Sequence, residues 1–97
     1  MLTRSEILNV LKAIKPEIHA QYGVKDIGLF GSFVREEQTQ NSDIDILVEF
    51  DRPIGFFKFL ELEEYLTGRL GRKVELVSKK ALKPRIGKYI LEEVVEV

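Results

Sequence analysis

The chain of 97 residues has no cysteine, only one histidine and no long apolar run. The lack of cysteine excludes disulfide bonds and metal sites built on thiolates. A membrane-spanning helix needs about 18 or more consecutive apolar residues, and no such stretch or signal-peptide pattern is found. We therefore expect a cytoplasmic protein without membrane contacts, folded as one domain over residues 1–97.

Strong positive charge is also lacking, because the formal net charge is -1. A protein that holds long nucleic acid by bulk attraction is expected to be basic, so direct binding of that kind is not predicted. The last third of the chain is nevertheless locally basic. Its basic residues suit a triphosphate, an acidic partner or an ordinary solvated surface, and they are Arg69, Arg72, Lys73, Lys79, Lys80, Lys83, Arg85 and Lys88.

The most informative stretch is residues 31–50, in which a Gly-Ser pair is followed, ten residues later, by an Asp-x-Asp pair. Apolar residues alternate from Asp43 onward, so the carboxylates of Asp43 and Asp45 project from the same face of a strand. Their Cα atoms would lie about 6.5 Å apart, and the two charges would repel each other without a cation. Mg²⁺, or Mn²⁺ in its place, is typically held by one or two carboxylates together with substrate phosphates.

Gly31 and Ser32 are the candidates for binding those phosphates. Glycine lets the backbone approach a ligand closely, and the amides after it open a short helix predicted over residues 33–37. Residues 24–30 are predicted to form the strand before it. The two residue pairs together, Gly31-Ser32 and Asp43-x-Asp45, are therefore predicted to form one active site.

This spacing resembles the signature of the DNA polymerase beta-like nucleotidyltransferases, and in particular of the minimal nucleotidyltransferases (MNT) found as antitoxins beside HEPN-domain toxins. Arg35, the turn at Asn41-Ser42, the VELV segment and the C-terminal tail extend the resemblance over most of the chain. It implies ATP as the donor of AMP. It also implies a tyrosine hydroxyl of a partner HEPN toxin as the acceptor, so that the antitoxin silences the toxin and can form an oligomer with it.

Two further site residues follow from the resemblance. Glu75 occupies the place of a third carboxylate, which in the family is usually aspartate; it would bind the metal or serve as the base, or its presence reports weakened activity. Arg35 would contact the phosphates, or it would form a surface ion pair with Glu36 or Glu37. The residues alone leave these alternatives open.

The remaining segments are predicted to supply the scaffold. A capping box at Thr3 opens a helix that ends near Gly23 and is broken or kinked near Pro16. A core-facing helix is predicted over residues 56–70 and a strand over 72–77. His19 is expected at the surface, without a role as ligand or base.

Two further sets of apolar residues lie in predicted helices. Phe56, Phe57 and Phe59 fit either a platform for stacking bases or a core helix, and their helical spacing favours the core. Pro84 opens a helix predicted over 84–92, followed by a short closing segment over 94–97. The inward residues of that helix are predicted to be Ile86, Tyr89 and Ile90.

Three strands separated by helices predict a two-layer α/β (α+β) domain, with helices mainly on one face and the carboxylates on the open face. The short helix and loop between the first two strands are compatible with antiparallel pairing of these strands. The resemblance implies the nucleotidyltransferase fold, with a mixed sheet of three or four strands. The hydrophobic pattern does not fix the strand order.

Three other functions are compatible with the Asp-x-Asp pair. The first is an antitoxin that masks its partner by binding alone, with weak or idle aspartates. The second is a glycosyltransferase, which also uses Asp-x-Asp but needs a longer chain and leaves Gly31-Ser32 unexplained. The third is a structural role in which the aspartates only cap a strand.

Overall fold

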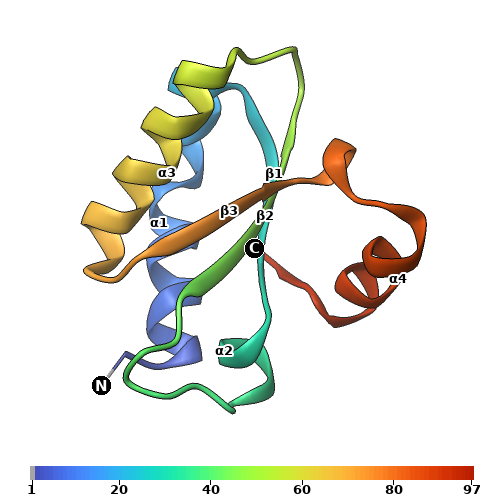
Figure 1. The fold of residues 1–97 in the computed structure, drawn as a ribbon. Coiled ribbons are helices and arrows are strands. Elements are labelled where there is room, and N and C mark those ends of the chain that lie inside the picture. Colours follow the sequence, from blue (N-terminus) through green and yellow to red (C-terminus); the bar gives the residue numbers. More distant parts are fainter. Residues whose placement is uncertain (1) are drawn as a thin grey trace.

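The computed structural model describes residues 2–97 and shows an α+β arrangement (Figure 1). The elements follow one another as α1 (Arg4–Tyr22), β1 (Val24–Phe30), α2 (Ser32–Arg35), β2 (Ile44–Phe50), α3 (Phe56–Leu70), β3 (Val74–Ser78), the 3-10 turn η1 (Lys79–Ala81), α4 (Pro84–Glu93) and β4 (Val95–Glu96). Among the described helices, none has the length and apolar character needed to cross a bilayer.

The strands form one mixed sheet in the order β3-β2-β1-β4. β1 pairs antiparallel with both β2 and β4, whereas β2 and β3 run parallel. A parallel pair needs a long crossover connection, and α3 provides it. The predicted mixed α+β fold is confirmed. The antiparallel pairing of β1 with β2, which the short connection allowed, and the strand order are given by the structure.

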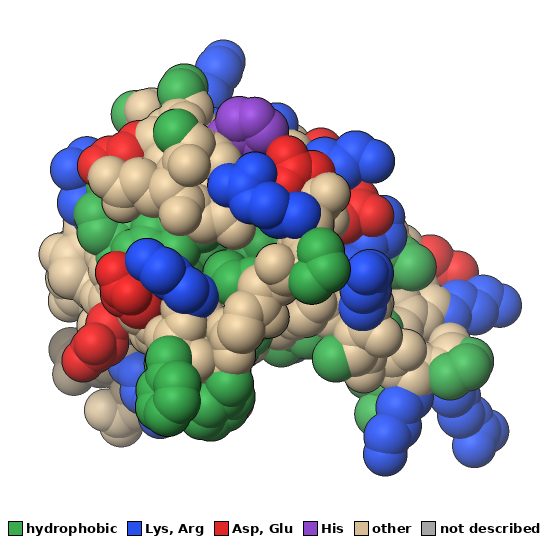
Figure 2. All heavy atoms as spheres, turned by 90° about the horizontal axis from the view of Figure 1, so that it is seen from above, with side chains coloured by type: hydrophobic (Ala, Val, Ile, Leu, Met, Phe, Trp, Pro, Cys, Tyr) green, Lys and Arg blue, Asp and Glu red, His purple; other side chains and the backbone are tan. Residues whose placement is uncertain are grey.

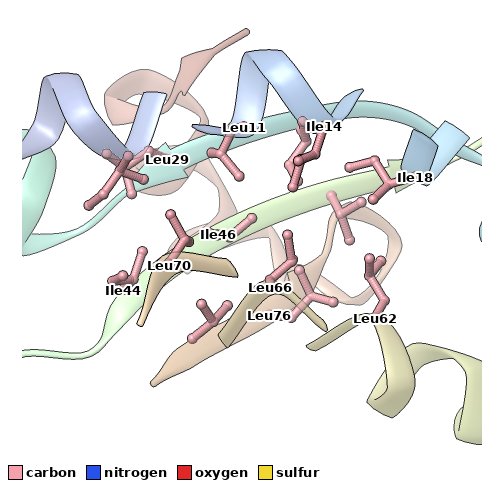
Figure 3. Close-up of a cluster of buried hydrophobic side chains, with 14 of the residues drawn as sticks. Leu11, Ile14, Ile18, Leu29, Ile44, Ile46, Leu62, Leu66, Leu70 and Leu76 are labelled. Atoms are coloured by element: carbon pink, nitrogen blue, oxygen red, sulfur yellow. The ribbon is translucent and has the colours of Figure 1, made fainter. Parts of the chain in front are cut away.

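The helices α1 and α3 lie side by side on one face of the sheet, and α4 stands on the other side (Figure 1). The inward side chains of α1 and α3 meet those of the strands in a continuous apolar core (Figure 3). The core members share near-complete burial and include Ile7, Leu11, Ile14 and Ile18 of α1, Ile27 and Leu29 of β1, Ile44, Ile46 and Val48 of β2, Leu62, Leu66 and Leu70 of α3, and Val74 and Leu76 of β3. The opposite face of β2 carries Asp45 and Glu49, with the buried Leu47 between them.

Helix α1 begins at the predicted capping box, since Thr3 and Glu6 exchange hydrogen bonds, and it ends at Gly23 with φ of 73°. The predicted break at Pro16 is absent, because the helix continues to Tyr22. Proline leaves the carbonyl of Lys12 without its helical partner. Both Lys12 and Pro16 are exposed, so water can hydrogen-bond that carbonyl while the buried face of the helix stays intact. His19 is exposed as predicted, and its Nδ1 lies 2.9 Å from the carbonyl oxygen of Val24.

Two expectations about inward apolar residues are wrong. Phe56 and Phe57 are 69% and 83% exposed, because the fully buried stripe of α3 begins only at Leu62. Phe59 is partly buried against the core, as predicted. Tyr89 is also 69% exposed and Ile86 projects to solvent as well, since the buried position of α4 is Gly87. Figure 2 looks onto the end of the molecule where α3 begins, and hydrophobic side chains stand out from the surface there and on α4 at the right.

Candidate functional site

The register of β1 and β2 brings the Gly-Ser bend to the Asp-x-Asp pair. Phe30, the last residue of β1, is paired with Asp45 of β2, and Gly31 follows directly. A methyl group added at Gly31 would lie only 2.9 Å from Cγ and 3.1 Å from Cβ of Asp45. The backbone of Gly31 has φ of 81°, a conformation that favours glycine. Both the space and the backbone at this bend therefore require glycine.

Ser32 begins the short helix α2 immediately after this contact. The helix was predicted over residues 33–37, but it starts one residue earlier and ends before Glu36, which has φ of 57°. The first N–H groups of a helix have no partner within the helix. In α2 these amides, together with the Ser32 hydroxyl, lie directly after the residue that contacts Asp45.

The other predicted carboxylates are on the neighbouring strand and at the start of β2. Glu75 is exposed and is paired with Asp45 in the parallel register of β3 and β2, where strands lie about 4.8 Å apart. Asp43 precedes β2 and lies 3.9 Å from Nζ of Lys73, whose side chain is 76% exposed. Across residues 2–97 no three Asp, Glu, His or Cys side chains are gathered to hold a metal. A metal bound here would take further ligands from its substrate.

The charge of these acids is only partly balanced. Burial, followed by the charges of Glu75 and Asp43, raises the pKa of Asp45 to about 6, although Arg35 acts in the opposite direction. A bound cation would relieve that repulsion. Carboxylate oxygens beside a bend with spare amides are the donors that suit Mg²⁺ or Mn²⁺ held jointly with phosphates, so the residues fit such an ion.

Arg35 forms one of the two surface ion pairs that were predicted as alternatives, and a further one that was not predicted. Its Nε lies 2.7 Å from Oε1 of Glu37, one of the two predicted partners. The other, Glu36, pairs instead with Arg4. A second partner of Arg35 is Glu93, at 2.5 Å from the guanidinium. The guanidinium therefore remains beside the site, held by acids from two parts of the chain.

Glu93 is the site residue that sequence reasoning missed. Its Oε2 accepts a hydrogen bond of 2.7 Å from the N–H of Gly31, while Oε1 accepts one from Arg35. The residue comes from the last turn of α4, 62 positions after Gly31. No motif surrounds it, and only the packing of α4 and β4 against β1 brings it here.

Several basic residues of the last third have local structural partners. Arg72 donates hydrogen bonds to the carbonyls of Ser42 and Thr39, at 2.6 and 2.7 Å, and so fixes the loop before Asp43. Its guanidinium also lies over the ring of Phe33. Lys79 lies 3.7 Å from Glu49. These contacts favour a structural interpretation for Arg72 and Lys79.

The chain is similar to known proteins in family, in sequence and in structure. The family model described as "Nucleotidyltransferase domain" matches residues 10–97. The chain is 50% identical to the protein adenylyltransferase MntA of Thermococcus cleftensis, over all of this chain and 98% of that protein.

Two solved structures are similar over most of the chain. One is a toxin-antitoxin with AMP-PNP, with a TM-score of 0.71, 25% identity, and coverage of 98% of this chain and 72% of that chain. The other is tri-AMPylated Shewanella oneidensis HEPN toxin in complex with MNT antitoxin, with a TM-score of 0.66, 25% identity, and coverage of 92% and 68%. The expected fold and family are confirmed by these comparisons.

The first prediction concerns the bend. Gly31→Ala should lower the free energy of unfolding by about 1–3 kcal/mol, because alanine is strained at this φ and its methyl group meets Asp45. Gly71→Ala is the matched control, since Gly71 has φ of 69° and nothing within 4 Å of the added carbon. Denaturant unfolding should show the larger loss for Gly31→Ala. Equal losses would mean that the contact with Asp45 is unimportant.

The second prediction concerns Asp45 and pH. Because its pKa is about 6 in the folded protein against 3.8 ordinarily, the folded state loses stability as the pH rises from 4 to 6. Asp45→Asn should therefore be more stable than the wild type at pH 7.5 without metal, by about 1 kcal/mol after allowance for solvent screening. The gain should shrink as the pH falls from 6 to 4. Unfolding curves across this range test it, with Asp26→Asn on the same face as control; a gain independent of pH would contradict it.

Proposed function

This chain belongs to the nucleotidyltransferase family, among its minimal protein adenylyltransferase members, and we propose that it transfers AMP from ATP to a hydroxyl group of a partner protein. The observation that carries the proposal is the contact between the Gly31 backbone and the Asp45 side chain. It places the bend that we propose to bind phosphates directly against the carboxylate that we propose to bind the metal. Neither a strand cap nor a glycosyltransferase accounts for that contact.

The residues divide between the metal and the phosphates. Asp43 and Asp45 would hold one or two Mg²⁺ ions, or Mn²⁺, with Glu75 as the further carboxylate. When bound, the metal supplies charge neutralisation for the triphosphate. The Ser32 hydroxyl and the amides that follow Gly31 would hold the distal phosphates, and Arg35 would add positive charge beside them.

The reaction follows from these positions. The oxygen of the acceptor hydroxyl forms a bond to the α-phosphorus of ATP, the bond from that phosphorus to the bridging oxygen breaks, and pyrophosphate leaves. Glu75 would accept the proton of the hydroxyl. Because phosphoryl transfer asks little covalent chemistry of the protein, the site contributes mainly by holding the phosphates in line and balancing their charge.

The partner we propose is a HEPN toxin, modified on a tyrosine and silenced by it. The similar structures support this, because one contains AMP-PNP and the other an AMPylated HEPN toxin with MNT antitoxin. The surface of the chain is compatible with a protein partner, since aromatic side chains such as Phe57 and Tyr89 are left exposed.

A second candidate function is neutralisation of the toxin by binding alone. Two observations favour it: Glu75 stands where the family resemblance expects aspartate, and the described residues form no ready three-ligand metal site. The two functions differ in whether a covalent AMP group appears on the toxin.

Transfer of label tests the proposed activity. ATP labelled at the α-phosphate is incubated with Mg²⁺, the protein and a HEPN toxin, and label on the toxin is measured. Asp43→Asn and Asp45→Asn should each lower transfer by about a hundredfold or more, and a chelator should stop it. Asp26→Asn is the control for loss of an acid from the same face. Undiminished labelling by both site variants would remove the assignment, and a silenced but unlabelled toxin would favour the second candidate.

Glu75 is tested by a pair of substitutions. Glu75→Ala should lower transfer by about a hundredfold, because both the third carboxylate and the proposed base are lost. Glu75→Asp should keep activity within about tenfold of the wild type, since it retains the carboxylate. Equal rates for the wild type and Glu75→Ala would show that Glu75 is structural.

A further inference from the structure

The carboxylate of Glu93 occupies the bend where the phosphates of ATP are proposed to bind. One of its oxygens accepts the Gly31 N–H at 2.7 Å, and the other accepts a hydrogen bond from the guanidinium of Arg35. Its side chain is 23% exposed. A single anion thus bridges a backbone amide of the bend and its nearest arginine, as an oxygen pair of a phosphate would.

We propose that Glu93 is an internal competitor of the triphosphate, which ATP must displace, and that it thereby sets the affinity of the site for nucleotides. The inference rests on the proposed function, and it adds the Gly31 N–H to the proposed phosphate-binding groups, beside Arg35, the Ser32 hydroxyl and the amides that follow. It adds a residue from α4 that limits binding by occupying those groups in the nucleotide-free protein.

The charge of the site explains why the Glu93 carboxylate and a bound triphosphate are not expected to remain there together. Asp43, Asp45 and Glu75 already give the site an excess of negative charge. Arg35 is the cation that lowers the pKa of Asp45, against the effect of Asp43 and Glu75. A triphosphate placed beside Glu93 would meet that carboxylate at short range. Removing the carboxylate, or turning it away, lowers the repulsion and frees two donors for the phosphates.

The backbone of α4 need not move for this exchange. Val94, the residue after Glu93, packs on Gly28 so closely that a methyl group there would lie 2.6 Å from Cγ2 of Val94. The end of α4 is therefore anchored to β1. The Glu93 side chain is partly open to solvent and has three rotatable bonds. Rotation of the side chain alone would therefore release the Gly31 N–H and the Arg35 guanidinium.

A purely structural role for Glu93 predicts the opposite sign. If the carboxylate only held Arg35 and the bend in place for phosphate, its removal would weaken nucleotide binding. If it competes with phosphate, its removal strengthens binding. The direction of the change in affinity separates the two.

The experiment compares Glu93→Gln with Glu92→Gln, which removes the same charge from the exposed neighbouring position on α4. Dissociation constants are measured for AMP-PNP with Mg²⁺, for tripolyphosphate with Mg²⁺ and for adenosine. Glu93→Gln should bind AMP-PNP and tripolyphosphate about three- to tenfold more tightly than the wild type, and adenosine equally. Glu92→Gln should match the wild type. Unchanged or weaker binding by Glu93→Gln would overturn the inference.

A measurement on the wild type keeps the inference testable if Glu93→Gln does not fold. The Gly31 amide signal in an NMR titration should shift as tripolyphosphate replaces the Glu93 carboxylate, and a signal unmoved at saturation would overturn the proposal. Failure of the proposed function looks different: wild-type protein would then bind neither AMP-PNP nor tripolyphosphate. Binding by the wild type without tightening in Glu93→Gln refutes only the role of Glu93.

Discussion

The antiparallel pairing of β1 with β2 is the constraint on which the site depends. It places Phe30 opposite Asp45, so the chain must turn at Gly31 directly against the Asp45 carboxylate. A shift of one residue in this register would turn Asp45 into the apolar core and Ile44 or Ile46 out of it. The apolar face that packs under α1 and α3 therefore also holds the acids on the open face.

Residues close in sequence were the ones that could be predicted. Gly31, Ser32, Asp43 and Asp45 lie within one stretch, whose strand alternation and glycine predict the local structure and the meeting of the bend with Asp45. The bounds of α3 (Phe56–Leu70) were also predicted, because its apolar spacing is regular and glycine follows it. The local sequence pattern was sufficient to predict a feature wherever that feature depended on a single helix or strand.

The predictions that failed depended on contacts between distant elements. The spacing of Ile86 and Tyr89 shows that α4 has an apolar side, but it does not show whether anything covers that side. A break at Pro16, predicted as one alternative beside a kink, does not occur, because the packing of the buried face maintains α1. Glu93 carries no local signal, because its role depends on how β4 pairs with β1 and carries the end of α4 toward the bend.

The hydrogen bond between Glu93 and Gly31 also joins two residues that are 62 positions apart in the chain. A contact of such separation forms only after the intervening chain has lost the conformational entropy of loop closure. It therefore adds to the contact order of the domain, a property that slows folding.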